Sequence, residues 1–138
     1  MEFSRRETLA MGLGAAALTV LPYRLMASAD DKIAEFTGGA DMADSGIELT
    51  APEIAENGNT VPISVSAPGA TAIMVLATGN PTPGVATFNF GPGAASQSAS
   101  TRIRLAGTQD VVAIAKMADG SFAKASAAVK VTIGGCGG

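Results

Sequence analysis

The chain has 138 residues, of which 47% are apolar and 4% aromatic, and its formal net charge is −3. It has no histidine and only one cysteine, so zinc sites and Ser-His-Asp triads have almost nothing to be built from. A mildly acidic chain without a basic stripe also makes nucleic acid and anionic membranes poor partners. The composition predicts one domain of small, closely packed residues that is not an enzyme by itself.

Residues 1–29 have the features of an export signal. The paired-arginine motif Ser4-Arg5-Arg6 precedes an apolar run over residues 9–21, and Ala27-Ser28-Ala29 matches the A-x-A pattern that signal peptidases accept. Arg24 interrupts the apolar stretch, which is therefore too short for a stable membrane span. We expect a twin-arginine (Tat) signal peptide, cleaved near Ala29, and a periplasmic protein; an ordinary Sec leader is the alternative.

Residues 30–45 give a weaker pattern. Asp30 and Asp31 could cap a short helix with Ile33 and Phe36 on one side, and Gly38-Gly39 would end it. A poorly ordered N-terminal segment is the alternative. Neither interpretation gives this segment any chemistry.

Residues 46–133 predict short strands separated by turns. Seven apolar or alternating segments recur at about ten-residue spacing, which is typical of an immunoglobulin-like antiparallel β-sandwich. They are residues 46–50, 61–65, 72–77, 85–90, 101–105, 110–117 and 121–133. The sequence lacks the Cys…Trp…Cys framework of antibody domains, so the similarity to immunoglobulins is architectural.

Several residues predict local details of this sandwich. The continuously apolar run 72–77 is expected to be a central strand, and Pro62 should lie at an edge or a bulge because proline cannot donate to a ladder. Asp119-Gly120 is the strongest hairpin signal in the chain, and Asn57-Gly58 favours a turn with positive φ. Phe88 and Phe90 would share one face of their strand.

Two groups of charged residues have competing interpretations. Arg102 and Arg104 alternate with apolar residues, so they form an anion site, a partner surface or simply the exposed face of a strand. Glu53, Glu56 and Asn57 resemble a metal cluster, but a solvated turn with Asx bonding is favoured. We therefore predict no metal site.

The last five residues, Gly134-Gly135-Cys136-Gly137-Gly138, hold the only cysteine between pairs of glycines. Because glycine packs nothing, this thiol is expected to be presented rather than buried. The nearest cation in sequence is Lys130, so neighbouring residues do not lower the thiol pKa and other proteins must supply the catalysis. Three extended residues reach about 10 Å, enough to enter a recessed partner site. The pattern favours a carrier thiol.

The ending over residues 131–138 resembles that of SoxY, the family of covalent sulfur carriers in periplasmic thiosulfate oxidation. Other segments that fit the family's pattern are residues 51–58, 61–63, 101–106 and 118–122. The poorest matches lie in residues 30–45 and 79–98.

The resemblance implies that Cys136 is the covalent attachment point for sulfur. Gly134, Gly135, Gly137 and Gly138 would then make residues 134–138 a flexible carrier arm on a sandwich formed by residues 46–133. It also implies a protein that catalyses nothing itself and needs no cofactor or metal.

The same resemblance implies particular partners. SoxZ would form a heterodimer with this chain, through an edge near Pro62 or the face bearing Phe88 and Phe90. A haem-containing SoxAX enzyme would join thiosulfate to the thiol, and the hydrolase SoxB would release sulfate. In many organisms SoxCD then oxidises the remaining sulfane sulfur.

Two functions of other classes stay open at this point. The first is a non-catalytic immunoglobulin-like binding module whose Cys136 is incidental or forms an intermolecular disulfide. The second is a ubiquitin-like carrier that uses its C-terminal Gly-Gly as a thiocarboxylate. The second is disfavoured because it needs adenylation, which an exported protein would not meet, and a helix that the strand pattern lacks.

Overall fold

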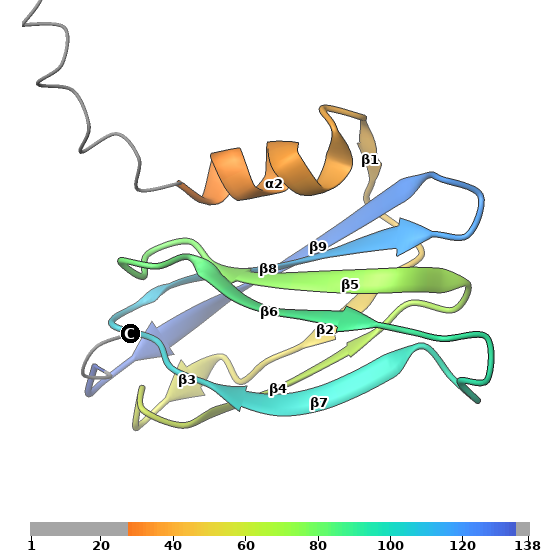
Figure 1. Cartoon of the computed structure of the whole chain (residues 1–138). Helices are drawn as coiled ribbons and strands as arrows, with labels where there is room; N and C mark the ends of the chain where they lie inside the picture. Colours follow the sequence, from red (N-terminus) through yellow and green to blue (C-terminus); the bar gives the residue numbers. More distant parts are fainter. Residues whose placement is uncertain (1–27, 135–138) are drawn as a thin grey trace, which may run out of the picture.

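The computed structural model describes residues 28–134, which form one helix and nine strands (Figure 1). The elements are α2 (Ala29–Thr37), β1 (Met42–Ala43), β2 (Glu48–Thr50), β3 (Ile54–Ala55), β4 (Val61–Ser66), β5 (Ala70–Ala77), β6 (Gly84–Asn89), β7 (Ser98–Ile103), β8 (Gln109–Met117) and β9 (Phe122–Val131). The seven expected strands correspond to β2 and β4 to β9. The two-residue strands β1 and β3 were not predicted.

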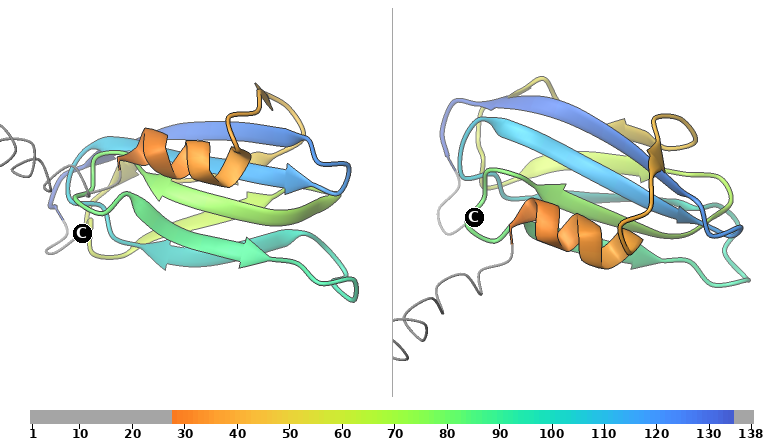
Figure 2. Two further views of the ribbon diagram at one scale, coloured as in Figure 1. Left: turned by 45° about the horizontal axis from the view of Figure 1, so that its top comes forward. Right: turned by 90° about the horizontal axis from the view of Figure 1, so that it is seen from above.

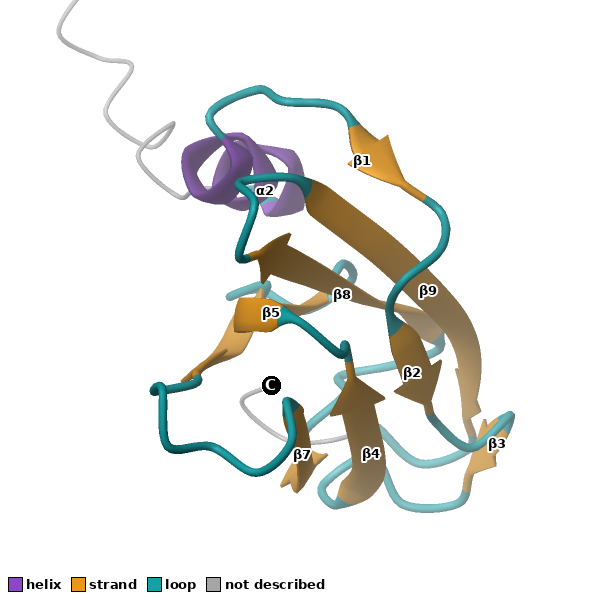
Figure 3. Ribbon diagram, turned by 90° about the vertical axis from the view of Figure 1, so that its right-hand side faces the viewer, coloured by secondary structure: helices purple, strands orange, loops and turns teal. Residues whose placement is uncertain are grey.

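The strands form two facing sheets, which Figure 3 shows nearly end-on. The larger sheet has the order β1-β9-β8-β5-β6, with β3 also paired to β9, and the smaller sheet has the order β2-β4-β7. The pairings among β5, β6, β8 and β9 and within the smaller sheet are antiparallel, whereas β1 and β3 run parallel to β9. The predicted β-sandwich is confirmed, with these parallel additions at the edge of β9.

The sequence of strand β5 is continuously apolar because both faces of the strand are covered. Ile73 and Val75 point into the core between the sheets, while Met74 and Leu76 belong to a second apolar cluster on the outer face. Helix α2 lies over this outer face (Figure 2) and packs Phe36 against it. The prediction that this strand is central is confirmed, since β5 pairs with β6 on one side and β8 on the other.

Helix α2 is defined by its two ends. The N-cap is Ser28, whose hydroxyl accepts from the Asp31 amide at 3.2 Å while the Asp31 carboxylate accepts from the Ser28 amide at 3.1 Å. At the other end Gly38 adopts φ 66° and donates to the Ala34 carbonyl. A helix therefore forms where the acidic pair indicated one, but its cap is the serine before that pair. Within residues 28–134, no helix has the length and apolarity required to cross a membrane.

The predicted turns had mixed outcomes. The Asp119-Gly120 hairpin is confirmed, with Gly120 at φ 87°. The positive φ expected at Asn57-Gly58 is wrong, because neither residue is among the positive-φ residues of the described chain. The turn is instead stabilised by the Asn57 side chain, whose Oδ1 accepts from the Asn59 amide at 3.0 Å.

Three expectations about strand positions can also be compared with the structure. Phe88 and Phe90 both pack against the inter-sheet core, as predicted. Pro62 pairs with Arg102 in β7. On the other side, β2 pairs only with residues 64–66 of β4, so Pro62 lies beyond the part of β4 that β2 covers. Strand β9 ends at Val131, two residues earlier than expected, and the Ile133 side chain is 66% exposed.

Candidate functional site

The described chain ends where the predicted carrier arm begins. Gly134 is described, whereas Gly135, Cys136, Gly137 and Gly138 lie outside the described residues. The described residues that support the arm are residues 132–134, here called the arm root, and the loops 55–60, 78–83 and 104–108. These loops and the end of β9 lie at the same end of the sandwich, here called the arm end (left side of Figure 1).

The arm root is hydrogen-bonded to the loop that follows β3. The Thr132 amide donates to the Ala55 carbonyl at 3.0 Å, and the Thr132 hydroxyl donates to the Glu56 carbonyl at 2.9 Å. The Gly58 amide then donates to the Ile133 carbonyl at 2.7 Å. These bonds continue the parallel β3–β9 pairing past the end of β9. The backbone direction of the arm root is thus determined by a segment more than 70 residues earlier in the chain.

Gly134 lies against the opposite loop. A Cβ atom built on Gly134 would overlap the carbonyl oxygen of Ala106, so this position has no room for a side chain. The two loops are themselves joined, because the Leu105 amide donates to the carbonyl of the buried Gly58 at 2.8 Å. The glycine predicted to give the arm freedom is therefore needed at Gly134 for a close backbone approach.

A buried amide holds the Ala106 loop in place. Asn80 is 9% exposed, and its Nδ2 donates to the Arg104 carbonyl at 2.8 Å. Its Oδ1 accepts from the Ala106 amide at 2.9 Å and from Nε2 of Gln109 at 2.8 Å. Gln109 also donates to the Gly107 carbonyl at 3.0 Å. The sequence did not mark Asn80 as important, because a polar residue beside a proline-rich turn gives no separate signal.

The charged groups considered from the sequence are exposed. Glu53 and Glu56 are exposed and bond the β9 end through their carbonyls, and residues 28–134 contain no group of three or more potential metal ligands. Arg102 and Arg104 are exposed, as expected for the outer face of a strand. The Arg102 guanidinium lies 3.4 Å from the Thr60 hydroxyl.

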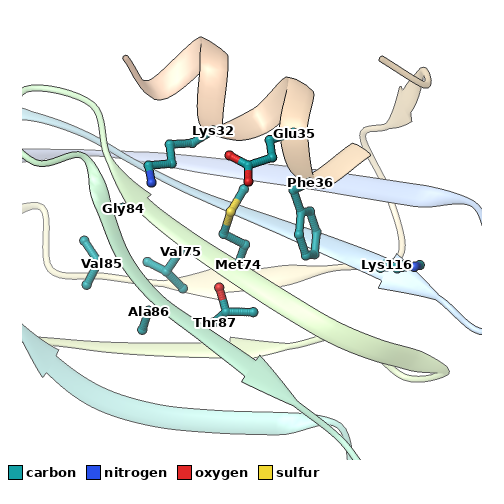
Figure 4. A pocket seen from close by; sticks show the side chains of 10 residues that line it. All are labelled: Lys32, Glu35, Phe36, Met74, Val75, Gly84, Val85, Ala86, Thr87 and Lys116. Carbon is teal, nitrogen blue, oxygen red and sulfur yellow. The ribbon is translucent and has the colours of Figure 1, made fainter. Parts of the chain in front are cut away.

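A cleft of about 530 Å³ lies away from the arm root, between α2 and strands β5 and β6 (Figure 4). Lys32 and Glu35 reach it from the helix, and the buried Met74 lies on its floor. Lys116 and Thr87 complete the polar part of its lining. None of the lining residues is a cysteine or a histidine, so the arm end remains the candidate site for thiol chemistry.

The comparisons with known proteins agree with the architecture. A family profile described as "Sulfur oxidation protein SoxY" matches residues 33–136, three quarters of the chain, and its match includes Cys136. The chain belongs to the SoxY family. Its fold matches the solved structure of the sulfur carrier protein SoxY from Chlorobium limicola f thiosulfatophilum with 39% identity and a TM-score of 0.66, covering 75% of this chain and 96% of that one.

More distant structures share the SoxY sandwich. A superoxide reductase (neelaredoxin) from Ignicoccus hospitalis matches with 19% identity and a TM-score of 0.56, over 78% of this chain and 95% of that one. At that identity the likeness concerns the fold alone. A search among curated proteins gave no significant match.

Proposed function

We propose that this protein is a sulfur carrier of the Sox system that holds thiosulfate-derived sulfur covalently on Cys136. The observation that carries the proposal is membership of the SoxY family over residues 33–136, a range that ends on the cysteine. The likeness to a solved sulfur carrier supports it further. Cys136 is also the only thiol in the chain, so no other side chain can form a disulfide-type bond to sulfur.

The proposed chemistry takes place on partner enzymes. In the first step the Cys136 thiol and thiosulfate form a sulfur–sulfur bond; one proton leaves, and two electrons pass to the haem-containing SoxAX enzyme. In the second step SoxB adds water to the terminal sulfone, releasing sulfate and one proton and leaving a persulfide (–S–SH) on Cys136. In hosts that have SoxCD, that enzyme oxidises the sulfane sulfur. The carrier contributes the thiol and its delivery.

The arm end suits this role. Hydrogen bonds from the loop 55–58 hold the arm root, so the delivery point stays fixed relative to the sandwich. Beyond Gly134, Cys136 has only glycine neighbours, which would let it enter a narrow site without a steric barrier. The two exposed large apolar side chains of the described chain, Ile54 and Ile133, also belong to the arm end and would contact a partner there.

The proposed setting is the periplasm, reached by the twin-arginine route with cleavage near Ala29. The Ser4-Arg5-Arg6 motif and the apolar run 9–21 support this route. The working unit is a heterodimer with SoxZ, and contacts with SoxAX, SoxB and SoxCD are transient. Because the carrier presents its cargo to these enzymes, we propose no catalytic residue, metal or cofactor of its own.

Thiosulfate turnover in a reconstituted system tests the proposal. With SoxZ, SoxAX, SoxB and an electron acceptor present, the wild-type chain should support acceptor reduction that depends on thiosulfate. The Cys136→Ser chain should support none, because serine cannot form the sulfur–sulfur bond. Turnover that survives Cys136→Ser would favour the binding module with an incidental cysteine. A wild-type chain that is active only as a disulfide-linked dimer would favour the intermolecular disulfide.

A further inference from the structure

We infer that Asn80 is a positioning residue for the carrier arm: it fixes the direction in which the chain leaves the sandwich at Gly134. The contacts behind this inference all lie within the described residues. Only the purpose of positioning the arm rests on the proposed function. The arm direction is then a property of the fold and is not left to the glycines alone.

One side chain, that of Asn80, holds the Ala106 loop. Asn80 bonds the Arg104 carbonyl and the Ala106 amide, which flank Leu105. Leu105 itself is fully buried in the inter-sheet core. The backbone on both sides of Leu105 is therefore held by Asn80 while its side chain is held by the core. Gln109 supports the Asn80 oxygen from the start of β8.

The Ala106 loop is in turn coupled to the arm root. The Ala106 carbonyl faces Gly134 so closely that no Cβ fits between them. On the other side, Gly58 donates to Ile133, and the Thr132 hydroxyl bonds Glu56. The chain thus leaves through a slot whose walls are the 55–58 loop and the 104–107 loop. A shift of the Ala106 wall would change the exit direction directly.

A defined direction of the chain at Gly134 would help a carrier to deliver its thiol. A tether that starts in a defined direction brings the thiol repeatedly to the same region, which reduces the orientational search when a partner site engages it. Asn80 does not touch the cargo in this scheme and acts through Ala106 and Gly134.

The test uses the single cysteine of the full chain. A nitroxide label on Cys136 reports the motion of the arm by its electron spin resonance line shape. Asn80→Ala, which removes the support, and Gly134→Ala, whose methyl group overlaps the Ala106 carbonyl, should each change the line shape. Two controls lie at the opposite end: Gln97→Ala removes a bond to the Gly69 amide, and Gly93→Ala adds a methyl group where nothing lies within 4 Å. Both controls should match the wild type.

Loading kinetics give the functional half of the test. With SoxZ and SoxAX, thiosulfate loading of Cys136 in Asn80→Ala and Gly134→Ala should be roughly tenfold slower in kcat/KM. Their alkylation by iodoacetamide should stay within about twofold of the wild type, because the thiol itself is unchanged. A variant that is merely less stable would not combine slower thiosulfate loading with an unchanged rate of alkylation.

Each outcome decides the inference. Unchanged line shapes, or unchanged loading, in folded Asn80→Ala and Gly134→Ala would overturn it. If Asn80→Ala does not fold, Gln109→Ala, which removes a bond to the Asn80 Oδ1, takes its place in both measurements. If the wild-type chain accepts no thiosulfate at all, the proposed function fails, and the line shapes still decide whether Asn80 positions the arm.

Discussion

The β8–β9 turn and the arm root lie at opposite ends of the sandwich and are held in different ways. At the hairpin end, the β8–β9 turn is closed by bonds between near neighbours: Gly120 donates to Met117, and the Asp119 carboxylate accepts from the amide and the hydroxyl of Ser121. At the arm end, Thr132 bonds Glu56 across 76 residues, and Asn80 bonds Arg104 across 24. The β8–β9 turn is closed mainly by its own residues, with one longer bond from the Ala118 amide to the Gly69 carbonyl at 2.9 Å, whereas the arm root depends on loops brought together by the whole fold.

This difference predicts that substitutions in the β8–β9 turn and in the arm root have different consequences. The Asp119–Ser121 bonds of the β8–β9 turn join neighbouring residues, so a change to Ser121 should have little effect elsewhere. The arm root is held from two sides, so a change in either loop should reach the arm. Matched substitutions at the two ends can therefore test this difference.

The largest expected effect is on the core. Leu105→Ala at the arm end and Phe122→Ala at the hairpin end each remove a buried side chain, and each should lower the free energy of unfolding by about 3 kcal/mol. Only Leu105→Ala should also change the line shape of a label on Cys136, because Leu105 anchors the loop that faces Gly134. Urea unfolding and electron spin resonance measure the two effects. Equal arm effects from both variants would remove the distinction between the ends.

A smaller effect is expected from matched hydroxyl deletions. Thr132→Val removes the bond to the Glu56 carbonyl, and Thr71→Val removes a bond to the Lys116 carbonyl at the hairpin end. Each should cost about 1 kcal/mol. Thr132→Val should also speed hydrogen exchange at the Gly58 amide, which donates to the neighbouring Ile133 carbonyl.

Thr71→Val is the control for that exchange measurement, and it should leave the Gly58 amide as protected as in the wild type. If both variants speed exchange at Gly58 equally, the arm root is no more sensitive to its own contacts than to distant ones.

The smallest effect is the pH dependence of the hairpin. The Ser121 hydroxyl, followed by the Ser121 amide, lowers the pKa of Asp119 below its ordinary value. A lowered folded-state pKa means that the charged carboxylate stabilises the turn above the ordinary pKa, and that this contribution is lost as the pH falls through the folded-state value. An NMR titration of Asp119 should show the lowered pKa, and Ser121→Ala should move it upward. An unmoved pKa in Ser121→Ala would contradict this cause.

The same contrast explains what could be predicted from the sequence. The alternation of Ile103 and Leu105 with Arg102 and Arg104 depends only on strand periodicity, and it gave the correct buried and exposed faces. Asp119-Gly120 specifies its turn through residues that touch each other. Such local signals were sufficient for the sandwich and for most of its strands.

The errors lie where distant segments decide the conformation. Asn57-Gly58 suggested a positive-φ turn, but Gly58 is held by Ile133 on one side and Leu105 on the other. The alternation of apolar residues predicts that β9 continues to Ile133, whereas the strand ends at Val131 and the chain bends over residues 132–133. Asn80 was missed since a buried amide in a loop has no periodic signature. The identity of Cys136 as a thiol between glycines was evident, but its support was not.

The central claim is that Cys136 carries the sulfur, and intact-mass measurement tests it most directly. After exposure to thiosulfate, SoxZ and SoxAX, the neutral mass of the chain should rise by that of S2O3, because an –S–SO3H group replaces the thiol hydrogen, and the gain should lie on the C-terminal peptide. Adding SoxB should reduce this gain to that of one sulfur atom, and Cys136→Ser should gain nothing. A wild-type chain that remains unmodified under turnover, or an adduct on any other peptide, would contradict the claim.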